Sequence, residues 1–126
     1  MKPLAKSKGV MIEEPEYFGP KSFSDAAVQH FPELSELKED ADLLDVQMGV
    51  LAASGRAAIE RGDMAFLRRL FAFLEDALNR PKLHHEIPRA VRTTFLTPGD
   101  FERSQSGSEA WALLPEKLKH ALQKAV

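Results

Sequence analysis

The sequence predicts an all-α protein: an antiparallel stack of about five to six helices behind a poorly ordered N-terminal arm. Apolar residues recur every three or four positions through most of the chain, and no run of alternating β-branched residues occurs. Glycine, proline and helix-capping residues separate the apolar stretches. With 126 residues the chain has the length of one domain. We therefore expect an arm at residues 1–21 and a single helical domain at 22–126.

The first helix is expected at Ser22, because Ser22 and Asp25 have the spacing of a capping box. Proline 32 should end it, and a short helix should follow over 32–39. Tyr17 and Phe18 are the expected anchors of the arm on the domain.

A long helix is expected over 41–61, with two glycines inside it. Each of Gly49 and Gly55 costs about 1 kcal/mol relative to alanine in a helix interior. Close approach of a neighbouring helix is the usual reason for keeping such a glycine. We therefore expect other helices to pack closely on this segment.

Gly62 and Asp63 mark the turn after the long helix. Glycine suits a left-handed residue just past a helix end, and aspartate suits the N-cap of the next helix. That next helix, 64–79, has an apolar stripe broad enough to be covered on two sides, so we expect it in the middle of the stack. Its predicted core residues are Leu70, Phe71 and Leu74.

Two prolines shape the C-terminal third. Pro88 requires the helix expected over 83–95 to begin near Ile87 or to be kinked. Ser106 is placed to cap the last helical segment, and Pro115 should split that segment into 108–114 and 116–125.

Composition excludes several classes of function. Seventeen Lys and Arg residues stand against 19 Asp and Glu, a formal charge of −2, which argues against a protein that coats nucleic acid or an anionic membrane. The absence of cysteine excludes disulfides, thiolate metal sites and a cysteine nucleophile. No stretch approaches the ~18 apolar residues of a membrane span, and no targeting segment is evident. We expect a cytoplasmic protein.

No residue pattern indicates catalysis, a cofactor or a metal. His84, His85 and Glu86 form the one local cluster of metal-binding residue types, but adjacent residues on a helix point about 100° apart and cannot both hold one ion. The chain has neither a glycine-rich phosphate loop nor a nucleophile motif. We expect a protein that is not an enzyme and that has no catalytic residue, cofactor or metal.

Charge is unevenly distributed along the chain. Between residues 33 and 45, six carboxylates stand against one lysine. This stretch is typical of a solvated face with favourable helix-dipole placement, or of an acidic surface that docks a basic protein. The second interpretation assigns partner binding to Glu33, Glu36, Glu39 and Asp40, with the three glutamates along one edge of a short helix.

A basic stretch over residues 80–92 supports an alternative function. Arg89 and Arg92, with the nearby Lys82, could contact phosphate in a nucleic-acid-binding regulator. The nearby Pro88 and the negative overall charge argue against that alternative.

Residues 31–95 resemble an uncharacterised bacterial family of small all-helical domains. The resemblance rests on Leu-Leu-Asp-Val-Gln-Met-Gly-Val-Leu at 43–51, on Gly62-Asp63, and on Phe-Ala-Phe-Leu-Glu at 71–75. These are mostly core and turn positions. Such domains look similar to immunity proteins that neutralise bacterial toxins. The resemblance implies a protein-binding function with a toxin as the partner, and it brings no catalytic residues. The acidic stretch over 33–45 would suit a toxin that is basic.

Overall fold

The computed structural model describes residues 18–39 and 43–124. Within this part of the chain the fold is all-α, as predicted, and the sole β-type pairing is a single bridge between Phe18 and Leu83. The elements are α1 (Pro20–His30), α2 (Glu36–Glu39), α3 (Leu44–Arg61), α4 (Met64–Leu78), α5 (Glu86–Thr94), a 3₁₀ helix (Pro98–Phe101), α6 (Gln105–Leu113) and α7 (Glu116–Lys124). The described residues form seven α-helices, slightly more than the expected total of five to six, and they include the expected short helix before α3 and the expected separation of α6 from α7 at Pro115.

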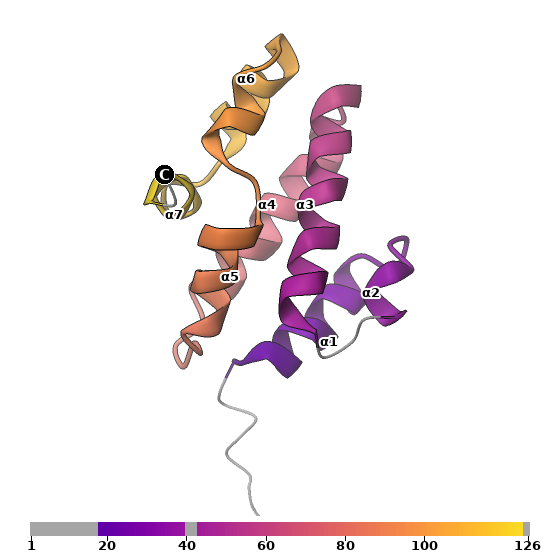
Figure 1. The fold of residues 1–126 in the computed structure, drawn as a ribbon, viewed down its shortest axis with the longest axis vertical. Coiled ribbons are helices and arrows are strands. Elements are labelled where there is room, and N and C mark those ends of the chain that lie inside the picture. The colour runs from indigo at the N-terminus through magenta and orange to yellow at the C-terminus, as the bar shows by residue number, and fades with distance from the viewer. Residues whose placement is uncertain (1–17, 40–42, 125–126) are drawn as a thin grey trace, which may run out of the picture.

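The centre of the stack is shared by α3 and α4. Helix α3 packs against α1, α2, α4, α5 and α6, whereas α4 packs mainly against α3, α6 and α7. In Figure 1, α1 and α2 lie near the N-terminal end of α3, and α6 lies toward its C-terminal end. The prediction that α4 lies in the middle is thus incomplete, because α3 has more neighbours.

Gly55 lets α3 pack closely, as its position inside a helix predicted. A Cβ atom built there would lie 3.2 Å from Leu70 Cδ2 and 3.2 Å from Leu96 Cδ1. Gly49 is different, because a Cβ atom there would meet nothing within 4 Å. The expectation of a close neighbour is therefore confirmed at Gly55 and wrong at Gly49.

The turn between α3 and α4 has the predicted caps. Gly62 is left-handed, with φ 70° and ψ 29°, and its N–H donates to the carbonyl of Ile59 at 3.1 Å. The Asp63 carboxylate accepts a hydrogen bond from the N–H of Phe66 at 3.1 Å, so it caps α4. Two residues therefore reverse the chain between the two central helices.

Helix α1 begins two residues before the predicted cap. Pro20 occupies its first turn, Gly19 is the N-cap, and no side chain caps this end. Proline suits the first helical position because its missing N–H would have no partner there. The prediction of a cap at Ser22 is wrong for that reason.

The N-terminal segment is anchored by Phe18. This residue is buried and exchanges backbone hydrogen bonds with Lys82 (2.8 Å) and His84 (2.9 Å), which confirms it as an anchor. Tyr17 lies outside the described residues.

The C-terminal elements follow the prolines, with one cap displaced. Pro88 is the third residue of α5, in the first turn, where backbone N–H groups lack helical partners. Ser104, and not Ser106, caps α6 by accepting the N–H of Gly107 at 3.0 Å. A Cβ at Gly107 would lie 2.5 Å from the carbonyl oxygen of Phe101. This close approach to the 3₁₀ helix fixes where α6 starts.

The predicted core residues of α4 are buried. Leu70 and Leu74 are fully buried and Phe71 is 1% exposed. Around α4, the ring of Phe73 lies against Phe23 and Phe31, with centroid distances of 5.4 Å in both pairs. This aromatic cluster fixes α1 and the segment after it on α4, which positions the site described next.

Candidate functional site

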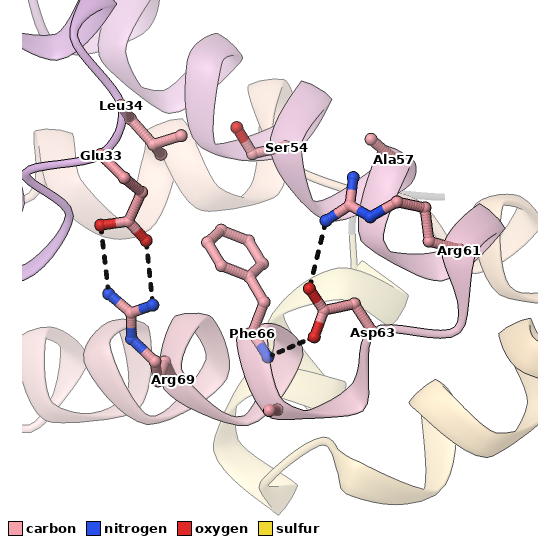
Figure 2. A pocket seen from close by; sticks show the side chains of 9 residues that line it. Glu33, Leu34, Ser54, Ala57, Arg61, Asp63, Phe66 and Arg69 are labelled. Carbon is pink, nitrogen blue, oxygen red and sulfur yellow. Dashed lines mark hydrogen bonds and ion pairs between the residues drawn. The ribbon is translucent and has the colours of Figure 1, made fainter.

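A surface groove lies between the turn that follows α1 and the outer sides of α3 and α4 (Figure 2). Its volume is about 430 Å³. The apolar part of its lining consists of Leu34 from the turn, Ala57 from α3, and Ala65 and Phe66 from α4. Both Leu34 and Phe66 are half-buried, so part of each side chain remains accessible from the groove.

One end of the groove is formed by Glu33 and Arg69. The Arg69 guanidinium donates to both carboxylate oxygens of Glu33, at 2.9 and 3.4 Å, and to the carbonyl of His30 at 2.8 Å. It also lies 5.2 Å from the Phe31 ring centroid and 5.7 Å from that of Phe66. The hydrogen bond from Arg69 lowers the pKa of Glu33. Both side chains are about half exposed, so the pair adds little stability and mainly fixes the turn against α4.

The other end is formed by Arg61 and Asp63. Arg61 Nη2 lies 3.2 Å from Asp63 Oδ2. The backbone hydrogen bond from Phe66, followed by the hydrogen bond from Arg61, lowers the pKa of Asp63. Both ends of the groove thus carry charge that is already paired within the chain, whereas the part between them is apolar except for Ser54.

The predicted acidic edge is only partly assembled. Helix α2 begins at Glu36 and not at Pro32, because the N–H groups of Leu34 and Leu37 close tight turns onto Phe31 and Leu34. Glu33 consequently lies before the helix and borders the groove. Glu36 and Glu39 are exposed on α2. Asp40 lies outside the described residues. The three glutamates therefore do not line one helix edge, and their role in binding a partner stays a prediction.

Sequence reasoning missed two features of this region. Arg69 is separated from Glu33 by 36 residues, and no local pattern pairs them. Leu43 and Val46 belong to a motif read as mostly core, but they are 53% and 44% exposed. Their spacing of three residues was the one sequence signal that they lie near each other. It could not show that they are exposed, because periodicity does not tell which side of a helix faces the core.

The basic stretch over residues 80–92 is partly neutralised inside the chain. Arg80 pairs with Asp76, four residues before it, at 3.3 Å, and lies 4.5 Å from the Phe18 ring centroid. Arg89 binds Glu86, and this contact lowers the pKa of Glu86 and raises that of Arg89. Arg92 is exposed.

The two adjacent histidines of this stretch stack on each other. Their ring centroids are 4.4 Å apart, and His84 Nδ1 accepts the backbone N–H of Glu86 at 3.1 Å, at the start of α5. In the described part of the chain, no group of three His, Asp or Glu side chains is placed to hold a metal ion.

The fold and this surface define a class: a small all-helical domain with an apolar groove and exposed carboxylates beside it. Among the described helices, none combines the length and apolar character that a membrane crossing requires. The cytoplasmic location stays a prediction.

Residues 25–126 match a family model described as "Domain of unknown function (DUF7674)". Because the match spans most of the chain, the protein belongs to this family. This agrees with the expected uncharacterised family. The likeness to immunity proteins and the bacterial origin stay predictions. No curated protein and no solved structure matches the chain.

Proposed function

We propose that this chain is a non-enzymatic protein-binding domain and that its acidic surface docks a basic protein. The acidic surface comprises Glu36 and Glu39 of α2, together with Glu33 and Asp40, which adjoin that helix in the sequence. Arg69 already neutralises Glu33. Glu36 and Glu39 form no ion pair with any other described residue, so their charge is available to a partner.

The observation that carries the proposal is the exposure of both carboxylates on a four-residue helix. Like charges this close repel each other by a few tenths of a kcal/mol. A positively charged partner would offset that repulsion, and its attraction to the two carboxylates would speed association by electrostatic steering. The proposal contains no catalytic step.

A finer proposal is that the basic partner is a toxin and that this chain is its immunity protein. It is supported by the resemblance of residues 31–95 to domains of that kind and by the acidic character of residues 33–45. A toxin that acts on nucleic acid needs a positively charged surface, and an acidic domain that covers this surface would block the toxin.

The test is quantitative capture from a native lysate with three versions of the protein. The wild type should retain a basic protein at low salt, and Glu36→Lys with Glu39→Lys should lose at least about 90% of it, since two attractive contacts become repulsive. A matched control is Glu102→Lys with Glu109→Lys, which makes the same charge change at exposed sites near α6. Equal capture by the acidic-surface variant and the control would contradict the proposal.

The same experiment addresses the alternative, a nucleic-acid-binding regulator that uses residues 80–92. Nucleic acid recovered by the wild type, and lost on Arg92→Ala but not on the α2 substitutions, would support this alternative. The pairing of Arg80 and Arg89 with their own acids leaves this stretch with less free positive charge than its sequence suggests.

A further inference from the structure

Gln47, in the first turn of α3, is a polar side chain inside the apolar core. It is fully buried. An apolar residue usually occupies a position of this kind, because burying an amide removes the hydrogen bonds that it makes with water. A specific contact should therefore account for the amide of Gln47.

That contact is made to α2, which lies near the N-terminal end of α3 (Figure 1). The amide nitrogen Nε2 of Gln47 donates a hydrogen bond to the backbone carbonyl of Leu37 at 2.9 Å. The last four carbonyls of a helix have no partner within it, and α2 has four residues in all. Because Leu37 is fully buried, its carbonyl needs a partner inside the protein, and Gln47 supplies one.

The other half of the amide lacks a partner. In the part of the chain that the structure describes, the buried carbonyl oxygen Oε1 of Gln47 accepts no hydrogen bond. An acceptor of this kind lowers stability, because the hydrogen bonds it makes with water in the unfolded chain are lost. Methionine, an unbranched side chain of similar length, would avoid this cost. Gln47 is therefore better suited to fixing the place of α2 than to stabilising the fold.

The place of α2 decides where its two carboxylates point. Successive residues of a helix are about 100° apart around its axis, so with Leu37 in the core Glu36 and Glu39 lie on the side away from it, about 60° from each other. Both are exposed. Their common direction therefore depends on which side of α2 faces α3.

Helix α2 is too short to keep that orientation by itself. It has four residues, whereas isolated helices of fewer than about 12 residues are marginal in water. Among the described residues, Gln47 is the only one whose side chain makes a hydrogen bond to α2 from another element. The burial of Leu37 is not directional and leaves α2 free to turn. A hydrogen bond to its backbone fixes both its rotation and its position along α3.

We propose that Gln47 is the positioning residue of the acidic surface. Its buried amide holds α2 in the orientation in which Glu36 and Glu39 face a basic partner together. The identity of that partner rests on the proposed function, whereas the hold of Gln47 on α2 is a property of the free chain.

Hydrogen exchange of the free chain, followed by NMR, tests this hold. In the wild type the side-chain amide of Gln47 should exchange at least about tenfold more slowly than those of the exposed Gln29, Gln105 and Gln123. Gln47→Met keeps a flexible, helix-forming side chain but removes the donor. The Leu37 carbonyl then needs water, so the backbone amides of α2 should exchange at least about tenfold faster in this variant.

Stability and association together separate a positioning role from a general role in packing. Gln47→Met exchanges one unpaired acceptor, Oε1, for another, the Leu37 carbonyl, so the urea midpoint should stay close to that of the wild type. The association rate with the captured basic protein should still fall by at least about threefold, because Glu36 and Glu39 lose their common direction. Met48→Leu, a conservative change at the neighouring fully buried position, is the matched control and should alter neither exchange nor association.

Two results on the free chain would overturn the proposal: a Gln47 amide that exchanges as fast as the exposed ones, or α2 exchange that Gln47→Met does not accelerate. Faster α2 exchange with an unchanged association rate would also overturn it, since the hold would then not orient the surface. The proposed function fails instead if Glu36→Lys with Glu39→Lys has no effect on capture. The exchange measurements need no partner, so the two failures are distinguishable.

Discussion

Gly62 and Asp63 form the turn that connects the two central helices, α3 and α4. Gly62 has a φ of 70°, a conformation that a β-branched residue adopts only with strain. We expect Gly62→Val to lower the free energy of unfolding by about 1–2 kcal/mol or more in urea titrations. Gly62→Asn, whose side chain tolerates the left-handed region better, should cost less. Equal stability of the valine variant and the wild type would show that the turn has another geometry.

The two interior glycines of α3 should respond oppositely to the same substitution. Gly49→Ala adds a methyl group in open space and should raise the free energy of unfolding by about 1 kcal/mol. Gly55→Ala places its methyl 3.2 Å from two leucine side chains, so crowding should cancel the gain in helix propensity. The measurement is urea unfolding of both variants and of the wild type. Equal gains at both sites would mean that α3 packs less tightly than described.

At the residue scale, the sequence predicts contacts that are local. The caps at Gly62 and Asp63 involve neighbours within one turn, and they are as predicted. The caps expected at Ser22 and Ser106 are wrong, because a nearby proline and a close backbone approach move the helix starts. The pair of Arg69 with Glu33 spans the fold and has no local signal.

Helix α4 supplies the most buried apolar side of the stack, and Leu74 lies within it. Leu74 is fully buried, so Leu74→Ala should lower the free energy of unfolding by about 2–5 kcal/mol through lost burial and the cavity left behind. Arg68→Ala, at an exposed position of the same helix, is the control and should change stability by less than about 0.5 kcal/mol. Similar unfolding midpoints for the two variants would contradict this account of the core.

At the scale of elements, periodicity predicts where helices are but not which side of each faces solvent. It places α3 and α4 within a few residues of their observed ends. It also groups Leu43 with the apolar residues of α3, although this side chain is exposed. The exposed side depends on where α1, α2 and α5 pack, which is information that a single segment does not contain. The exposure of Leu43 and Val46 is therefore evident only in the folded chain.

At the scale of the whole molecule, composition and pattern predict the all-α class, while the arrangement of the helices comes from contacts distant in sequence. The groove shows the difference: its residues come from the turn after α1, from α3 and from α4. Of the predicted acidic edge, Glu36 and Glu39 remain exposed whereas Glu33 is paired with Arg69. The overall charge of −2 does not show which carboxylates are paired and which are exposed.

The central claim is that the acidic surface on α2 recruits a basic protein. The most direct test is the association rate constant of the captured partner with the immobilised chain, measured at low and at high salt. For the wild type we expect the rate to fall by at least about tenfold between about 20 mM and 500 mM salt, because screening weakens steering. Glu36→Lys with Glu39→Lys should remove most of that dependence and be slower at low salt. An unchanged rate and an unchanged salt dependence in the variant would contradict the claim.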